Sequence, residues 1–149
     1  MQEVTQFVIE FGKSLNLETQ QDKVGNVLIK KPATKGYESH PAIIIQSHLD
    51  MVPQKNSDVD HDFTKDPIQT YIDGEWVKAK STTLGADNGL GCAMMMSLLE
   101  DGMVNHPPIE ALFTIDEEVG MDGAFGLEPG FLKGTMMLNL DTEEDGDLC

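Results

Sequence analysis

The chain has 149 residues, 40% of them hydrophobic and 24% charged, which fits one globular domain with its own core and excludes an intrinsically disordered chain. Its 26 acidic residues outnumber its 10 basic residues, all lysines, and the net charge of -16 argues against nucleic acid as a partner because phosphates would be repelled. No stretch approaches the roughly 20 apolar residues that cross a bilayer, and the first residues lack the basic and apolar regions of a secretory signal, so we expect a cytoplasmic protein without membrane contacts.

Apolar periodicity predicts a helix and two strands in the first half of the chain. Residues 3–15 are predicted to form an amphipathic helix whose inward stripe consists of Val4, Phe7, Val8, Phe11 and Leu15. Strands are predicted over residues 24–29 and 42–47, and the β-branched composition of the second indicates that it is buried. Residues 53–66 are rich in Asp, Asn, Lys and Pro and are predicted to be a surface loop.

The second half continues the alternation of elements. Residues 68–73 and 75–79 flank an Asp-Gly turn signal and are predicted to form a β-hairpin. A helix is predicted to begin at Asp87, with one face made of Leu90, Ala93, Met94, Ser97 and Leu98. Strands are predicted over residues 109–115 and 136–140. Because strands alternate with helices, the sequence predicts an α/β fold with a mostly parallel sheet and helices on both faces.

Metal-binding types of side chain stand at the ends of the predicted strands and at the start of the predicted helix. They are His48, Asp50, Asp87, Glu117, Glu118 and Asp141. Functional groups in open α/β sheets gather outside the carboxyl ends of the strands, so we expect these side chains to converge. Residues two apart share one face of a strand, so Asp50 can contact His48 and orient it, as carboxylates do for metal-binding imidazoles.

One imidazole and three carboxylates suit zinc, or a similar first-row ion such as cobalt or manganese, better than calcium. Two ions fit the number of donors, since the two oxygens of Asp87 can bridge ions roughly 3.5–4 Å apart and so lower the pKa of a shared water to about 7. A hydrolase also needs a base. Of the consecutive acids Glu117 and Glu118, one can bind an ion while the other holds the water.

Each of these residues also has a simpler interpretation when taken alone. Asp87 can be a helix N-cap, and Glu117-Glu118 a solvated acidic pair. The remaining histidines, His40, His61 and His106, are expected at the surface, in polar or proline-flanked loops. Cys92 and Cys149 form no Cys-X-X-Cys pair, which argues against a thiolate metal site. The order of these acids in the chain, together with their placement at the ends of the predicted strands, is what favours a metal site.

Four blocks of the sequence together resemble a known family. They are residues 47–52 (SHLDMV), 83–89 (TLGADNG), 116–124 (DEEVGMDGA) and 139–141 (NLD). In this order they are similar to the metal-site blocks of the co-catalytic zinc exopeptidases related to aminoacylase and carboxypeptidase G2. Residues 48–87 and 121–127 resemble the aminoacyl-histidine dipeptidase branch, which is carnosinase-like.

The resemblance implies a role for each residue at the strand ends. His48 would bind the first metal with Asp141, and Asp50 would orient His48. Asp87 would bridge both metals and be followed by a cis peptide bond, Glu118 would bind the second metal, and Glu117 would be the general base and acid. The implied reaction is hydrolysis of small dipeptides, in particular Xaa-His dipeptides.

Relatives in this family have a second-metal histidine far toward the C-terminus and a lid domain that binds substrate and often forms dimers. We therefore expect residues 1–149 to be the N-terminal part of the catalytic domain of a longer hydrolase, and expect them to catalyse little alone. The alternatives are a related deacylase, tripeptidase or aminopeptidase on the same scaffold, or a non-catalytic binding module.

Overall fold

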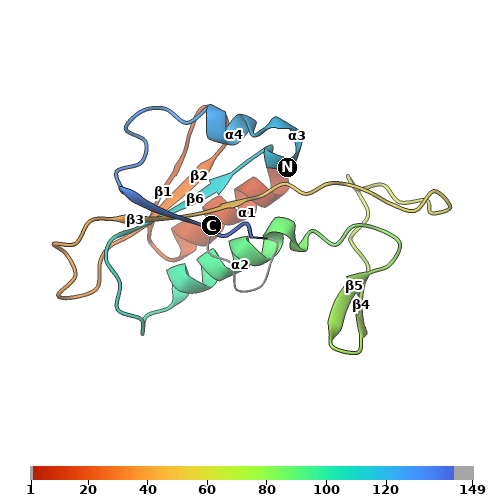
Figure 1. Cartoon of the computed structure of the whole chain (residues 1–149), viewed down its shortest axis with the longest axis horizontal. Helices are drawn as coiled ribbons and strands as arrows, with labels where there is room; N and C mark the ends of the chain where they lie inside the picture. Colours follow the sequence, from red (N-terminus) through yellow and green to blue (C-terminus); the bar gives the residue numbers. More distant parts are fainter. Residues whose placement is uncertain (1, 143–149) are drawn as a thin grey trace.

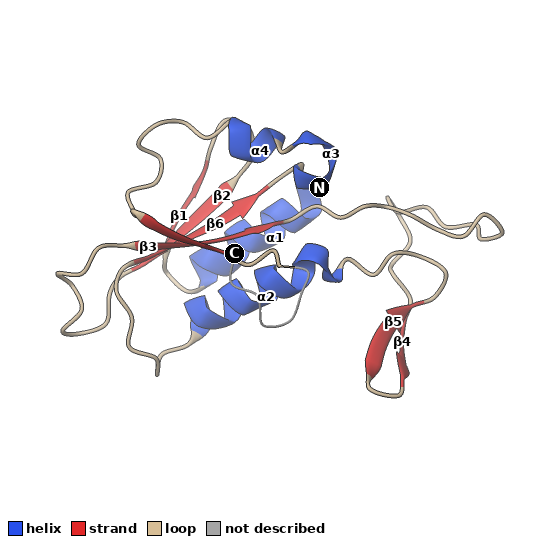
Figure 2. Cartoon of the chain, viewed as in Figure 1, coloured by secondary structure: helices blue, strands red, loops and turns tan. Residues whose placement is uncertain are grey.

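A computed structural model describes residues 2–142 of the chain (Figures 1 and 2). Its elements, in chain order, are α1 (Gln2–Ser14), β1 (Glu18–Gln21), β2 (Val27–Lys31), β3 (Ile43–His48), β4 (Thr70–Asp73), β5 (Trp76–Ala79), α2 (Ala86–Glu100), β6 (Ile109–Thr114), α3 (Glu117–Gly120), α4 (Asp122–Phe125) and β7 (Met136–Asn139). No helix within the described residues is long and apolar enough to cross a membrane.

Five strands form the central sheet, in the order β1-β2-β6-β3-β7. β3 lies in the middle of a parallel group, with β6 on one side and β7 on the other. β2 is antiparallel to β6, and β1 is antiparallel to β2, so β1, β6, β3 and β7 run in the same direction. The predicted α/β fold with a mostly parallel sheet is confirmed. Strand β1 was not predicted, because its Glu-Thr-Gln-Gln sequence has no apolar alternation.

Helices α1 and α2 cover one face of the sheet, and α4 with the segment that follows it covers the other (Figure 1). The first face holds the larger core, in which Ile45, Ala111 and Phe113 of the strands pack against Val8 of α1 and Met95 of α2. On the second face the buried residues Leu28, Ile44 and Leu112 pack against Leu127, Phe131 and Leu132. The alternation of strand side chains between two covered faces explains why the strands β2, β3 and β6 are mostly buried.

The predicted inward stripe of α1 is confirmed in part, since Val8 is buried and Phe11 and Leu15 pack against the core, whereas α2 turns a largely different face to the sheet from the one that was predicted. In α1 the buried residues are Thr5, Val8 and Gly12, whereas Phe7 is 58% exposed. A Cβ atom at Gly12 would collide with Thr19 and Ile29, so the helix packs closely there. In α2 the buried residues are Asn88, Gly91, Cys92, Met95 and Leu99, whereas the predicted face is exposed at Leu90 and Met94. These helices have apolar residues on more than one face, and small residues decide which face can approach the sheet.

The predicted hairpin is present, formed by β4 and β5 as a separate two-stranded sheet away from the central one (Figure 2). Asp73 pairs with Trp76, so the turn residues are Gly74 and Glu75. The prediction that His106 lies at the surface was wrong. His106 is 6% exposed; its backbone N–H donates to the Thr34 hydroxyl at 2.8 Å, and its Nδ1 lies 2.7 Å from the carbonyl oxygen of Pro107.

Candidate metal centre

His48, the last residue of β3, stands at the centre of the candidate site. Its side chain is 1% exposed, so the ring is held by the sheet. Its Nδ1 lies 3.0 Å from the backbone carbonyl oxygen of Asp50, and its Nε2 lies 3.0 Å from Oδ1 of Asp87. Nε2 is therefore the ring atom that faces the acidic groups and could bind a metal.

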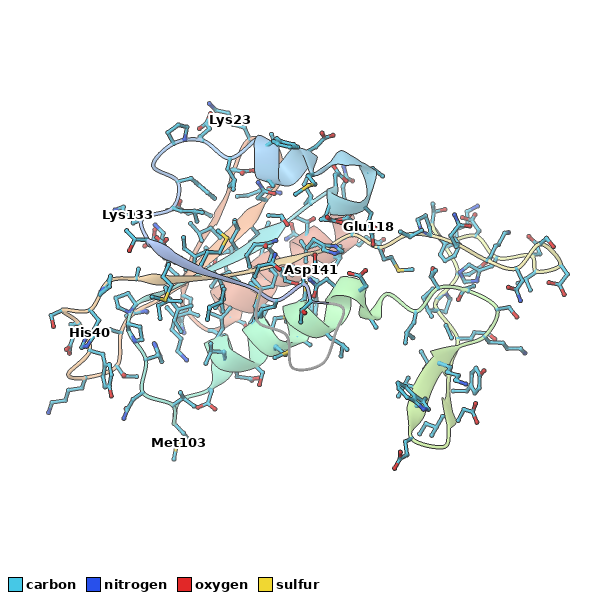
Figure 3. All side chains as sticks on the ribbon, viewed as in Figure 1. Lys23, His40, Met103, Glu118, Lys133 and Asp141 are labelled. Carbon is cyan, nitrogen blue, oxygen red and sulfur yellow. The ribbon has the colours of Figure 1, made fainter. Side chains whose placement is uncertain are left out.

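Carboxylates from three further elements surround Nε2 of His48. Oδ2 of Asp141, just after β7, lies 3.7 Å away, and Oε2 of Glu117, the first residue of α3, lies 4.0 Å away. Figure 3 labels Glu118 and Asp141, which approach the region near the start of α2 from different elements. The structure thus brings together residues that are more than ninety positions apart in the chain.

Asp50 holds the two consecutive glutamates through their backbone. Its side chain is 9% exposed, and its two oxygens accept hydrogen bonds from the backbone N–H groups of Glu117 at 3.1 Å and Glu118 at 3.0 Å. Its Oδ1 also lies 3.5 Å from Nδ1 of His48, farther than the Asp50 carbonyl oxygen. The sequence predicted contact with His48 but offered no signal for the contact with α3.

Glu117 and Glu118 begin a short helix instead of ending a strand. The residues on either side of this helix, Asp116 with φ 53° and Met121 with φ 60°, are both in the left-handed region. Such conformations are unfavourable for residues with a Cβ and tend to occur where a site depends on them. Here they turn the chain sharply at both ends of α3 and so set the positions of the two glutamates.

Asp87 lies at the start of α2, and its side chain is 67% exposed to solvent while its Oδ1 lies 3.0 Å from Nε2 of His48. Asp87 and Asn88 have non-helical backbone angles, and Asn88 caps the helix that follows, because its Oδ1 accepts the backbone N–H of Gly91 at 3.1 Å. The structure therefore does not support the simpler interpretation of Asp87 as a cap. The peptide bond between Asp87 and Asn88 is cis, as the family resemblance implied.

A buried layer of small polar residues lies beneath the site and was not foreseen from the sequence. Ser47 donates to the backbone carbonyl oxygen of Asn88 at 3.1 Å, and Cys92 donates through sulfur to the carbonyl oxygen of His48 at 3.1 Å. Ser47 and Cys92 also contact each other at 3.4 Å. This layer connects the end of β3 to the first turn of α2, and so connects His48 to Asp87. Because consecutive side chains of a strand alternate, Ser47 and His48 of β3 point to opposite faces of the sheet.

The donor set fits divalent metal ions of the zinc type. Among the described residues, two groups have ligand atoms that all lie within 4.8 Å of one another: His48 with Glu117 and Glu118, and His48 with Asp87 and Asp141. One imidazole nitrogen with several carboxylate oxygens is a donor set that suits first-row divalent ions, zinc among them. Among the described residues, His40 and His61 belong to neither group.

The crowding of negative charge shifts two pKa values. Burial alone would lower the pKa of His48, but the carboxylates of Asp141 and Asp50 outweigh it, and the pKa is raised. Burial raises the pKa of Glu118, and the neighbouring Asp87 raises it further. Both shifts have the sign expected where several carboxylates share a small space, an arrangement that a bound cation would stabilise.

Two comparisons show strong similarity to dipeptidases, although no protein-family model matches the chain. The chain is 52% identical over 147 residues to the cytosol non-specific dipeptidase of Escherichia coli (strain K12), covering 99% of this chain and 30% of that protein. The crystal structure of aminoacylhistidine dipeptidase from Vibrio alginolyticus matches with a TM-score of 0.93 and 55% identity, covering 97% of this chain and 29% of that one. The resemblance predicted from the four sequence blocks is confirmed.

A more distant structure shows the fold alone. An aminopeptidase from Bacillus cereus matches with a TM-score of 0.74 and 24% identity, over 93% of this chain and 37% of the other. The chain spans about 30% of the length of the two dipeptidases that it matches.

Proposed function

On the premise that this chain is a relative of the aminoacylhistidine dipeptidases along nearly its whole length, we propose that it carries the metal site of a dipeptidase whose substrates include Xaa-His dipeptides. The observation that carries this proposal is the position of the His48 imidazole, with Asp87, Asp141 and Glu117 within 4.0 Å of its Nε2 atom. The activity is proposed for the complete polypeptide that contains these residues, with residues 1–149 in its catalytic domain.

The residues divide between two neighbouring metal ions in this proposal. His48 and Asp141 would hold the first ion, Glu118 would hold the second, and the carboxylate of Asp87 would serve both. Zinc suits this mixture of nitrogen and oxygen donors, and cobalt or manganese would fit the same donors. Both groups of possible ligands contain His48, which supports a site in which one imidazole and several carboxylates together hold the ions.

Glu117 is the proposed general base and acid. Ions bound at the site would supply a water whose pKa is lowered to about 7 and a positive charge beside the substrate carbonyl. Glu117 would accept a proton from the attacking water as the oxygen of that water forms a bond to the carbonyl carbon. The same carboxyl group would then donate that proton to the amide nitrogen as the C–N bond breaks, and the second proton of the water passes from the new carboxylic acid to the amine, which leaves a carboxylate and an ammonium group. Asp50 holds the backbone of Glu117 in place during both transfers.

Replacing Glu117 with Gln in the complete polypeptide tests this role. The amide cannot accept the proton, so we expect kcat for an Xaa-His dipeptide to fall by about 100-fold or more, while bound metal is retained. Glu75→Gln, in the exposed hairpin turn, is the control. Near-normal turnover by Glu117→Gln would contradict the assignment. A panel of N-acyl amino acids, tripeptides and dipeptides would separate dipeptidase from deacylase, tripeptidase and aminopeptidase activity.

The proposed compartment is the cytoplasm, and the proposed substrate partner is a small dipeptide. The Escherichia coli relative is named a cytosol dipeptidase, which supports that location. Cys92 is buried and free, as is common in reducing compartments, whereas Cys149 lies outside the described residues.

A further inference from the structure

A pocket of about 150 Å³ opens directly beside the candidate base, and the dipeptidase proposal assigns it no role. Glu117 and Asp141 form part of its lining. Its floor is the sheet face opposite α1 and α2, where Leu112, Gln46 and Asn139 lie side by side on β6, β3 and β7. His48 is two residues after Gln46 in β3 and so has its side chain on this same face.

The wall of the pocket comes from α4 and the turn before it. Met121, Ala124 and Leu127 contribute apolar atoms to the lining. This wall is anchored by Asn26, which is fully buried: its amide donates to the carbonyl oxygen of Gly123 at 2.8 Å and accepts from the backbone N–H of Ile115 at 3.2 Å. A Cβ at Gly123 would collide with Asn26 and Ile115, so α4 packs closely onto the end of β6. The pocket is therefore built into the fold and is not a gap beside a loose loop.

The polar groups of the pocket floor are bonded to one another. Gln46 donates to the hydroxyl of Thr114 at 3.0 Å, and Asn139 donates to Gln46 at 2.5 Å. The side-chain oxygen of Asn139 accepts the backbone N–H of Asp141 at 3.0 Å. A floor whose amides are already paired gains little from a polar ligand. The acids at the rim also repel an anionic group.

We propose, resting on the dipeptidase function above, that this pocket binds the side chain of one of the two substrate residues and prefers an uncharged apolar group. The pocket is open to solvent and combines apolar side chains with the paired amides of its floor, and a volume of about 150 Å³ is large enough for a side chain up to the size of Leu or Phe. Ala124 and Met121 set the size of this pocket, and Glu117 and Asp141 at its rim place it next to the scissile bond.

The test compares Gly-Gly, Leu-Gly, Gly-Leu, Asp-Gly and Gly-Asp as substrates of the complete polypeptide. Ala124→Phe fills the pocket, so we expect kcat/KM for one of the two Leu substrates to fall about tenfold or more while Gly-Gly is unaffected. The affected substrate identifies which residue occupies the pocket. Met121→Ala enlarges the pocket and should raise the rate for a Phe-containing dipeptide relative to Gly-Gly. Phe125→Leu, on the same short helix but 82% exposed and outside the lining, is the matched control.

Three results would overturn the pocket assignment. The first is that Ala124→Phe lowers kcat/KM equally for the Leu substrates and for Gly-Gly. The second is that Met121→Ala leaves the ratio of the rates for the Phe-containing dipeptide and Gly-Gly unchanged. The third is that the wild-type protein hydrolyses both Asp substrates as fast as the Leu substrates. If Ala124→Phe does not fold, Met121→Ala and the wild-type Asp and Leu rates decide the question. Failure of the wild-type protein to hydrolyse any dipeptide is a different result, since it would contradict the dipeptidase function itself.

Discussion

One oxygen of the Asp50 carboxylate accepts the backbone N–H of Glu117 at 3.1 Å, which ties the loop after β3 to the first residue of α3. The other oxygen accepts the N–H of Glu118 at 3.0 Å. Because the same carboxylate lies 3.5 Å from Nδ1 of His48, one side chain links the central imidazole to both glutamates. Asp50 is therefore in a position to keep a proposed base and two proposed ligands in register.

Asp50→Asn is expected to reduce activity without unfolding the protein. The Asn side chain keeps one acceptor but turns an NH₂ group toward a backbone N–H, so α3 shifts and kcat/KM falls by about 10–100-fold, the usual effect of losing such a supporting partner. Dipeptide kinetics and metal content by mass spectrometry measure the effect. Asp58→Asn, in the exposed loop, is the control. Wild-type kinetics for Asp50→Asn would show that the link is not needed.

Asp87→Ala is expected to change how many metal ions bind. If Asp87 lies between two ions, its removal weakens both sites, and the complete polypeptide should retain less than one ion per chain under conditions where the wild type retains two. The measurement is metal content after dialysis against a weak chelator. Loss of only one ion, with the other held as tightly as before, would mean that Asp87 serves a single site. Asp58→Ala serves as the surface control.

Metal affinity is expected to fall as the pH is lowered, and the pKa of His48 determines the pH at which the fall begins. Nε2 must lose its proton before it binds an ion, and the pKa of His48 is raised above the ordinary 6.5 by Asp141 and Asp50 against the opposing effect of burial. Proton competition should therefore begin above pH 6.5. Zinc titration calorimetry from about pH 5.5 to about pH 8.5 measures the affinity and the protons released. A pH-independent affinity would contradict the role of His48.

The stability of the metal-free protein depends on pH in the opposite direction: the contribution of His48 to it falls as the pH rises. A raised folded-state pKa means that protonated His48 is favoured by the fold, so this contribution is fully present below about pH 6.5 and is lost as the pH rises through the raised pKa. The measurement is denaturant unfolding at several pH values with a chelator present. The free energy of unfolding should show this decline in the wild type and in the control variant His40→Gln, whose residue is exposed. His48→Gln should lack it.

Two glycines of α2 form a matched pair for a stability test. A Cβ at Gly91 would meet Oγ of Ser47 at 2.7 Å and the carbonyl oxygen of Leu140 at 2.9 Å, whereas a Cβ at Gly89 would meet nothing within 4 Å. Gly91→Ala should therefore lower the free energy of unfolding by roughly 1–3 kcal/mol through overpacking. Gly89→Ala should be neutral or stabilising, since Ala favours a helix. Thermal unfolding measures both, and equal behaviour would contradict the close packing seen at Gly91.

Much of the fold follows from local pattern, but the packing of the helices does not. The β-branched run before His48 and the apolar runs in β6 and β7 predict strands because periodicity and side-chain shape are local properties. The apolar residues of α1 and α2 lie on several faces, so the pattern correctly placed Val8 inward but also placed the exposed Phe7 and Leu90 there, and it missed the buried Met95. That choice depends on how closely each helix approaches the sheet.

The sequence by itself determined which chemical groups gather near the carboxyl ends of the strands, because a parallel sheet collects those ends at one edge. Only the tertiary structure decided that Asp50 bonds to the backbone of Glu117 and Glu118, and that Met121 and Ala124 enclose a pocket beside Glu117. Both arrangements join segments far apart in the chain, and their distances depend on the twist of the sheet and on the left-handed turns around α3. Spacing along a sequence carries no measure of such distances.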